Sequence, residues 1–369
     1  MTAVRPRARD LGVVIGLLPP GPLNAITDVE GVRVGHTTLV RGDGPLRPGE
    51  GPVRTGVTVV VPPGEVGDSC YAGTHTLNGN GEMTGLEWVR ESGMLTTPVG
   101  LTNTHSVGVV RDAIVAAECR LRPPGDLFWA LPVVAETWDG MLNDINGQHV
   151  RAEHLFAALD AAAGGPVAEG NVGGGTGMIC HELKGGIGSS SRVIEQALGG
   201  HTVGALVQAN HGRRERLAVA GRPLGQLLGR SEIASPYDAV PAPDKAGSGS
   251  IIVILATDAP LLPHQCRGLA ERAGLGIARA GGAGERTSGD IFLAFATGNR
   301  LRNPEHQTEV ATVRSVPDRT LSALYWAAIE ATEESIINAL VAAETMTGRD
   351  GITAHALPHD LVASWFRAA

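Results

Sequence analysis

The sequence predicts a layered α/β fold in which sheets are covered by helices, with an α+β arrangement as the alternative. Three observations support this prediction. Short segments rich in β-branched residues lie between Gly and Pro turns, which is typical of strands. Longer segments rich in Ala and Leu space their apolar residues as a helix does. Both kinds of segment occur along a chain of 369 residues, of which 43% are apolar and 18% are charged, so a large core can form. We expect the sheet to lie between layers of helices.

The elements follow from these patterns in chain order. Strands are expected at residues 26–40, 55–65, 201–212, 251–261 and 288–299. Helices are expected at residues 105–122, 150–165, 263–282 and 317–348. The apolar segment LGVVIGLL at 11–18 is expected to be a first strand or an apolar loop. It is not expected to be a targeting segment, because Asp10 interrupts the basic residues before it and PPGP follows it.

A linker is predicted over residues 221–250. This stretch is mostly Pro, Gly, Ser, Ala and Asp, with prolines at 223, 236, 241 and 243. It ends in GSGS, immediately before the apolar segment IIVILATDAPL.

The composition narrows the classes of partner. The net charge of −8 argues against nucleic acid or an anionic membrane. The cysteines at 70, 119, 180 and 266 show neither CxxC pairing nor zinc spacing, which indicates reduced cysteines in a cytoplasmic protein.

No cofactor and no metal are expected. The segment GNVGGGTGM at 170–178 lacks the GxGxxG and GK[ST] contexts of phosphate loops, so close backbone packing near a site is expected there. His355 and His359 are four residues apart, but Pro358 interrupts a helix between them. The chain contains no HExxH motif.

The Gly249–Ser250 junction lies between the predicted linker and an apolar strand. A serine hydroxyl is a weak nucleophile until a base removes its proton. Cutting the bond before Ser250 would free an α-amine, whose pKa of about 7.7–8 suits it to be that base. Gly249 lacks a Cβ and tolerates the strained backbone that self-cleavage needs. A plain Gly/Ser loop is the alternative, and Ser248 is the rival nucleophile.

Nine segments, in order over nearly the whole chain, resemble signatures of the DmpA/BapA-type family of self-processing aminopeptidases, which includes L-aminopeptidase/D-esterase and β-aminopeptidase. They are NAITDVEGVRVGHTT (24–38), GPVRTGVTVVVP (51–62), LNGNGEMTG (77–85), NTHSVG (103–108), ETWDGMLNDING (136–147), GGGTGM (173–178), KGGIGSSSR (184–192), GSIIVILATDAPL (249–261) and EATEESIINALVAAETMTG (330–348).

The resemblance implies one αββα sandwich domain over residues 1–369, made as an inactive precursor. It implies cleavage at Gly249–Ser250 into an α chain of residues 1–249 and a β chain of residues 250–369, with Ser250 as the N-terminal nucleophile. The expected substrates are short peptides, amides or esters, and the expected assembly is a homotetramer.

Ser288 and Asp290 are two residues apart, so in a regular strand they point the same way. The family uses a Ser/carboxylate pair here, with Glu in some members, and such a pair beside Ser250 would relay a proton and hold the α-amine. The resemblance also places the family's oxyanion asparagine at Asn210, at the end of a strand. A turn is the alternative at both places.

Glu136 and Trp138 lie in ETWDG. A carboxylate beside an aromatic face suits the ammonium group that an aminopeptidase must recognise. The resemblance assigns Glu136 to the substrate amine and Trp138 to the pocket wall. Asp139 and Asp144 compete for the first role, and an exposed acidic turn is the alternative.

Two other functions remain open at this stage. Acyl transfer of the ornithine acetyltransferase type uses a similar architecture, but its members are processed before a threonine. A non-catalytic, glycine-rich metabolite-binding protein is the third hypothesis.

Overall fold

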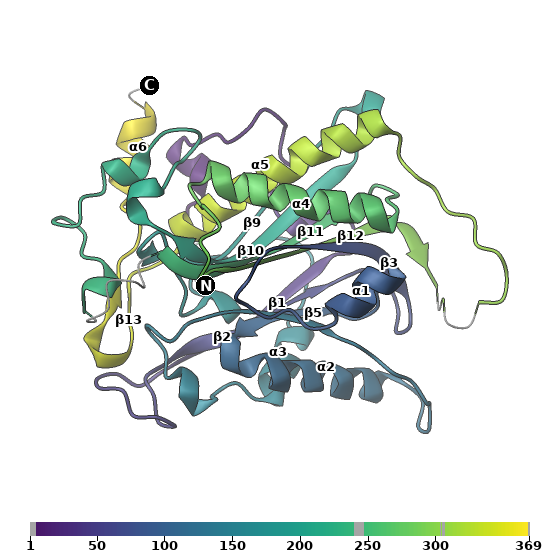
Figure 1. Ribbon diagram of the computed structural model, residues 1–369, viewed down its shortest axis with the longest axis horizontal. Coiled ribbons are helices and arrows are strands. Elements are labelled where there is room, and N and C mark those ends of the chain that lie inside the picture. Colours follow the sequence, from purple (N-terminus) through teal and green to yellow (C-terminus); the bar gives the residue numbers. More distant parts are fainter. Residues whose placement is uncertain (1–4, 240–246, 303, 305–306, 368–369) are drawn as a thin grey trace.

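Two β-sheets lie face to face, and a pair of helices covers the outer face of each (Figure 1). The computed structural model describes residues 5–239, 247–302, 304 and 307–367, without the side chains at 247, 248 and 367. The four layers run α, β, β, α, as the fold prediction required. In the described part of the chain, no helix combines the length and the apolar character needed to cross a membrane.

The smaller sheet has four strands in the order β1-β2-β5-β6. Their bounds are Arg33–Arg41 for β1, Val53–Val61 for β2, Val99–Asn103 for β5 and Val133–Thr137 for β6. Helices α2 (Val107–Leu121) and α3 (Ala152–Asp160) cover its outer face. Val57 and Val59 of β2 pack outward against Ile114 and Leu155, whereas Val60 packs inward.

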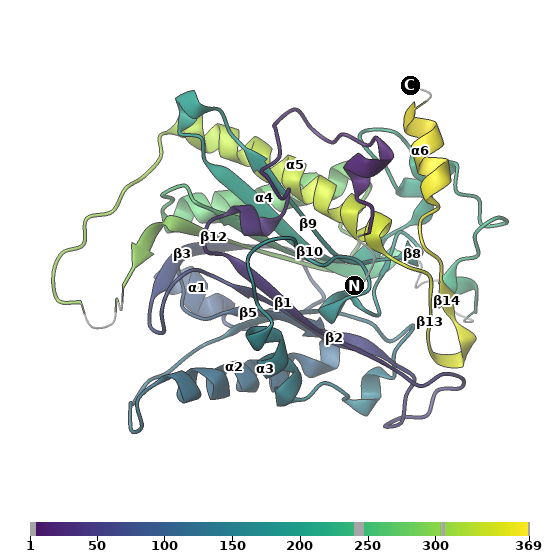
Figure 2. The same ribbon diagram turned by 180° about the vertical axis from the view of Figure 1, so that it is seen from behind.

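The larger sheet has six strands in the order β4-β3-β12-β11-β10-β9. Their bounds are Met94–Leu95 for β4, Ser69–Gly79 for β3, Gly289–Leu301 for β12, Gly247–Thr257 for β11, Thr202–Gly212 for β10 and Gly186–Val193 for β9. Helices α4 (Pro263–Arg279) and α5 (Asp318–Ala342) cover its outer face (Figure 2).

Strand β11 alternates between the two cores, because successive side chains of a strand point to opposite faces. Ile252 and Ile254 pack between the sheets. Ile251 and Val253 pack against the helices α4 and α5. Ser250 has the same parity as Ile252, so its side chain is on the face that meets the smaller sheet.

Short elements complete the fold. They are α1 (Leu86–Ser92), β7 (Ile179–Cys180), β8 (Leu183–Lys184), β13 (Met346–Thr347), β14 (Thr353–Ala354), α6 (His359–Arg367) and several single-turn 3-10 segments.

The expected elements are present, with corrected bounds. Residues 26–28 form a 3-10 turn, so the first strand begins only at Arg33. Residues 11–18 form a loop rather than a strand, with Val13 and Ile15 buried. The last long helix stops at Ala342 instead of residue 348, because Ala343 is extended (φ −70°, ψ 145°).

The predicted linker is only partly a linker. Residues 221–239 form turns that pack on the domain, with Leu224 and Leu228 buried. The predicted segment also contains the start of β11, at Gly247. Residues 240–246, between these two parts, lie outside the described residues.

Candidate active site

Ser250 is held at the centre of the larger sheet. It pairs with Asn210 across the antiparallel strands β10 and β11, and its neighbour Ile251 pairs with Asp290 of the parallel strand β12. The Gly289 N–H donates a hydrogen bond to Ser250 Oγ over 3.1 Å. Ser250 is buried, with 6% of its surface exposed. The sheet pairing and this hydrogen bond therefore fix the position of the Ser250 hydroxyl.

Gly249 is required by close approach. A Cβ at this position would lie 1.8 Å from the carbonyl oxygen of Asn210, which no side chain tolerates. The glycine before the serine therefore has a steric reason as well as the conformational one argued from the sequence. The side chain of the rival Ser248 lies outside the described residues.

Ser288 and Asp290 form a hydrogen-bonded pair where β12 begins. The Ser288 hydroxyl donates to Asp290 Oδ1 over 2.6 Å, and the Asn78 amide Nδ2 donates to Asp290 Oδ2 over 3.0 Å. Burial raises the pKa of Asp290, while the hydrogen bonds from Ser288 and Asn78 oppose that rise. The pair is thus fixed in one orientation.

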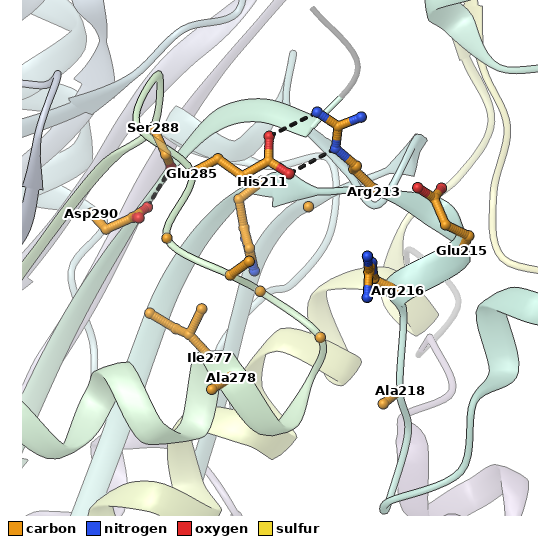
Figure 3. A pocket seen from close by; sticks show the side chains of 15 residues that line it. His211, Arg213, Glu215, Arg216, Ala218, Ile277, Ala278, Glu285, Ser288 and Asp290 are labelled. Carbon is orange, nitrogen blue, oxygen red and sulfur yellow. Dashed lines mark hydrogen bonds and ion pairs between the residues drawn. The ribbon is translucent and has the colours of Figure 1, made fainter.

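This pair opens to a different cavity from Ser250. Ser288 and Asp290 line a cavity of about 700 Å³ beside the end of α4 (Figure 3). Phe292, of the same parity as Asp290, packs in the core under α4 and α5. Ser288 and Asp290 therefore approach position 250 from the face of the larger sheet that the helices cover. The Ser250 side chain lies on the opposite face.

Asn210 presents a side-chain amide fixed at both ends. Its Oδ1 accepts a hydrogen bond from the Ile179 N–H over 2.7 Å, and its Nδ2 donates to the Trp138 carbonyl over 2.9 Å. An amide NH₂ carries two hydrogens, so Nδ2 retains a second donor. A fixed donor beside a nucleophile suits an oxyanion hole.

Glu136 and Trp138 share a cavity of about 530 Å³ with Gly249 and Ser250. Glu136 is buried, with 2% of its surface exposed, and it lies at the end of β6 in the smaller sheet. It accepts hydrogen bonds from the Glu82 N–H over 2.9 Å and from the Thr104 hydroxyl. Trp138, 36% exposed, forms part of the wall. The cavity thus joins residues of both sheets.

Burial raises the pKa of the Glu136 carboxyl, and the hydrogen bonds from Thr104 and the Glu82 backbone oppose that rise. A cationic ligand at the wall of this cavity would stabilise the ionised form of the buried Glu136 carboxyl. Its position therefore suits an ammonium group.

Asp139 and Asp144, the alternatives to Glu136 as partner of the substrate amine, make hydrogen bonds to the surrounding loops instead. Asp139 accepts hydrogen bonds from the side-chain amides of Asn103 and Asn143, each over 3.0 Å. Asp144 accepts from the backbone N–H groups of Gly49 and Gly147 and contacts His149. Both side chains are buried in these contacts.

The glycine-rich segment packs closely, as expected. A Cβ at Gly174 would lie 2.1 Å from Gln208 Oε1, and one at Gly175 would lie 2.4 Å from the Ile187 backbone nitrogen. The absence of side chains at these glycines therefore lets the segment pack closely against the strands.

Sequence reasoning missed several residues of the site. The Asp290 carboxylate is held by Asn78, and the Glu136 carboxylate is held by the Glu82 N–H and Thr104. The Gly289 N–H donates to Ser250 Oγ. Asn78 and Glu82 lie in the quoted segment LNGNGEMTG and Thr104 lies in NTHSVG. Polar residues inside those segments were the available signal.

The sequence predicts no metal site, and the pair His355 and His359 was rejected because of Pro358. Among the described residues, the side chains of Cys180, His181 and His211 form a group of possible metal ligands that meets in space. His359, by contrast, bonds through Nε2 to the Val341 carbonyl over 2.8 Å.

Comparisons with known proteins agree with this geometry. The model of peptidase family S58 matches residues 24–354. The β-peptidyl aminopeptidase BapA of Sphingosinicella microcystinivorans is 52% identical over 368 residues, which cover 97% of this chain and 91% of that protein.

Two solved structures share the fold. A Burkholderia sp. β-aminopeptidase is 52% identical with a TM-score of 0.89, covering 98% of this chain and 99% of that one. The L-aminopeptidase D-Ala-esterase/amidase from Ochrobactrum anthropi is 44% identical with a TM-score of 0.90, covering 99% of both chains, and is described as a prototype for the serine aminopeptidases and a variant of the Ntn hydrolase fold.

These findings confirm the resemblance, the αββα fold and the hydrolase function, and they do not favour acyl transfer or metabolite binding. The chain belongs to peptidase family S58 and is an aminopeptidase of the N-terminal-nucleophile type.

Proposed function

We propose that the chain cleaves itself between Gly249 and Ser250, and that Ser250 then acts as the nucleophile on N-terminal residues bound through Glu136. One observation carries the proposal: Ser250, Gly249, Glu136 and Trp138 line one cavity, although they come from two different sheets. The cleavage separates an α chain of residues 1–249 from a β chain of residues 250–369.

Self-cleavage uses the serine hydroxyl on its own peptide bond. Ser250 Oγ attacks the Gly249 carbonyl carbon, the Gly249–Ser250 C–N bond breaks as an ester forms, and the hydroxyl proton passes to the departing Ser250 nitrogen. Water then hydrolyses the ester, which leaves a carboxylate on Gly249 and a free α-amine on Ser250. The Gly289 N–H on Ser250 Oγ holds the oxygen in place before the attack.

Substrate hydrolysis repeats this attack on another molecule. The substrate ammonium pairs with Glu136, and Ser250 Oγ attacks the carbonyl of the first residue while its proton passes to the Ser250 α-amine. Asn210 Nδ2 stabilises the oxyanion, and Ser288 with Asp290 holds the α-amine from the other side of the sheet. The leaving amine takes the proton, and water releases the acyl group from Ser250.

The proposed substrates are short peptides and amides with an N-terminal β-amino acid. Two relatives, 52% and 45% identical to this chain, carry the name β-peptidyl aminopeptidase. A β-residue adds one methylene between amine and carbonyl, a change that a pocket distinguishes by about 1–3 kcal/mol. D-residues are the second candidates, because the Ochrobactrum relative is an L-aminopeptidase D-Ala-esterase/amidase.

A substrate panel tests this proposal. The purified enzyme is assayed on the p-nitroanilides of β-homoalanine, D-alanine and glycine, with N-acetyl-β-homoalanine p-nitroanilide as the matched control. We expect the β-homoalanine compound to be cleaved fastest and the acetylated one not at all. Preference for glycine would contradict the substrate class, and acyl transfer to an added amine faster than hydrolysis would favour the acyltransferase instead.

Assembly as a homotetramer and a cytoplasmic location belong to the same proposal. Leu17, 97% exposed, and Trp326, 59% exposed, line an apolar groove of about 560 Å³ that a second copy of the chain would cover. The four cysteines are free, which suits a reducing compartment. Light scattering of the purified protein measures the assembly, and cell fractionation measures the location.

A further inference from the structure

Three side chains with metal-binding atoms meet behind the proposed oxyanion residue. Cys180 ends β7, His181 follows it in the turn to β8, and His211 comes from β10. Cys180 Sγ and one ring nitrogen of each histidine all lie within 4.8 Å of one another. Cys180 Sγ is 3.9 Å from His211 Nδ1. All three residues are buried.

The histidines leave ring nitrogens without partners among the described residues. His181 Nδ1 contacts the Arg213 carbonyl over 2.9 Å, but His181 Nε2 and His211 Nε2 are buried and make no hydrogen bond there. Buried polar atoms without partners are rare and call for an explanation such as an ion.

The backbone is arranged to place His181. His181 and Glu182 form the two-residue turn between β7 and β8 with φ values of 48° and 60°. This left-handed conformation usually requires Asn or Gly in such turns. Gly212 faces the His181 ring, and a Cβ there would lie 2.4 Å from it. Strained backbone of this kind concentrates at functional positions.

We propose that Cys180, His181 and His211 form a binding site for one Cu⁺ ion. A thiolate and two imidazoles are soft to borderline donors, which favour Cu⁺ and Zn²⁺ over hard cations. Ligands about 2.0–2.3 Å from a common metal lie roughly 3.3–3.8 Å apart, so small side-chain movements close the site. Binding breaks the Cys180 S–H bond, forms an S–Cu bond and releases one proton to solvent.

Charge selects Cu⁺ over Zn²⁺. Lys184 is buried near Cys180, and its Nζ donates to the carbonyls of Met178 over 2.9 Å and Gly185 over 2.7 Å. Cu⁺ with the Cys180 thiolate is neutral overall, whereas Zn²⁺ with the same thiolate leaves a net positive charge in a fully buried site, which is costly. Three donors also satisfy Cu⁺, whereas structural Zn²⁺ sites almost always have four.

A route to the site exists, because His211 also lines the 700 Å³ cavity beside α4 (Figure 3). The same cavity reaches Ser288 and Asp290. Of the three proposed ligands, His211 is the one that lines this cavity.

Occupancy of the site acts on Asn210. His211 is its chain neighbour, and Ile179, whose N–H holds Asn210 Oδ1, is the chain neighbour of Cys180. A metal shared by Cys180 and His211 would displace the backbone next to each ligand, and so shift both Asn210 itself and the Ile179 N–H that holds its Oδ1. This coupling rests on the proposed function of Asn210, and Cu⁺ is expected to inhibit the enzyme reversibly.

The binding test does not depend on activity. The Ser250→Ala, Cys119→Ser protein, which lacks the nucleophile and the exposed thiol, competes without oxygen against bicinchoninate for Cu⁺. We expect one equivalent to bind, with one proton released and X-ray absorption showing one sulfur and two nitrogen neighbours. Adding Cys180→Ser or His211→Gln weakens binding at least 100-fold, while circular dichroism verifies folding.

Three results would overturn the site. They are the absence of stoichiometric binding, unchanged affinity after Cys180→Ser, or two sulfur neighbours, which would indicate the other buried cysteines. Tighter binding of Zn²⁺ than of Cu⁺ would overturn the charge argument. In the active enzyme, one equivalent of Cu⁺ should lower kcat and bicinchoninate should restore it; full activity with the ion bound would overturn the coupling to Asn210.

Discussion

Asn210 and Ser250 lie directly opposite each other across the antiparallel strands β10 and β11. The proposed oxyanion donor and the proposed nucleophile are therefore positioned by sheet pairing rather than by loops. Sites built on regular elements hold their geometry more precisely than sites on loops. The carbonyl under attack must lie between these two strand ends, at the mouth of the cavity that contains Glu136.

Replacing Asn210 by Ala removes the oxyanion donor. We expect kcat to fall by about 10²–10³-fold, with a smaller change in KM, because the donor acts mainly on the transition state. Steady-state kinetics on β-homoalanine p-nitroanilide measure this. Asn146→Ala, at an exposed position of the same residue type, is the control and should retain wild-type rates. Equal kcat in the two variants would remove Asn210 from the mechanism.

Replacing Glu136 by Gln removes the proposed partner of the substrate ammonium. A charge-assisted hydrogen bond contributes about 1.5–3 kcal/mol, so we expect KM to rise roughly 10–150-fold while kcat changes less. The same variant should lose most of the discrimination between free and N-acetylated substrates. Retained discrimination in Glu136→Gln would show that another group recognises the amine.

In the proposed mechanism, Asp290 sets the pH dependence of activity through the Ser250 α-amine. A neighbouring carboxylate favours the charged ammonium and so raises the pKa of that amine. Because the amine must be neutral to act as base, Asp290→Asn should move the acid limb of kcat/KM to lower pH, by up to about one unit. Asp112→Asn, at an exposed position, makes the same change in net charge and should leave the profile in place. A shift to higher pH in Asp290→Asn would contradict this role.

Asp139 makes stability depend on pH. Burial raises the pKa of Asp139 from 3.8 to about 6, against the hydrogen bonds from Thr55, Asn143 and Asn103. Between these values the folded chain holds a proton that the unfolded chain has lost, so this group's contribution falls as pH rises, by about 1.4 kcal/mol per pH unit.

The stability test compares precursors, using the Ser250→Ala chain as background. The difference in unfolding free energy between that precursor and its Asp139→Asn variant should shrink from pH 4 to pH 6 and then stay constant. Precursors with and without Asp112→Asn should give curves that remain parallel over the same range. A constant difference for Asp139→Asn would mean that Asp139 ionises in its ordinary range.

Local sequence patterns predicted the four long helices and five of the ten strands in the two sheets, and the family resemblance implied their arrangement. Apolar periodicity identified these elements because each has one face in a core, but it missed β3, β4, β5, β6 and β9. It did not predict the end of α5 at Ala342, or that Glu334 in this helix is fully buried. That burial depends on ion pairs with Arg9 and Arg192, which are far away in the sequence.

In the candidate site too, some features could be predicted from the sequence and others depend on contacts between distant segments. The residues allow self-cleavage at Gly249–Ser250 as one of two interpretations, and the resemblance favours it; the proposed roles of Asn210 and Glu136 rest on the resemblance as well. The face occupied by Ser288 and Asp290 could not be predicted, because it depends on the register of β12 against β11. The meeting of Cys180 with His211 could not be predicted either, because it depends on the tertiary packing of β7 against β10, and the two residues are thirty-one positions apart.

The cut at residue 250 is the central claim, and intact-mass analysis of freshly purified, active enzyme tests it most directly. We predict two polypeptides, residues 1–249 and 250–369, whose masses add up to that of the precursor plus one water, and a single inactive chain for Ser250→Ala. Full turnover by a preparation that contains only the uncut 369-residue chain would contradict the account.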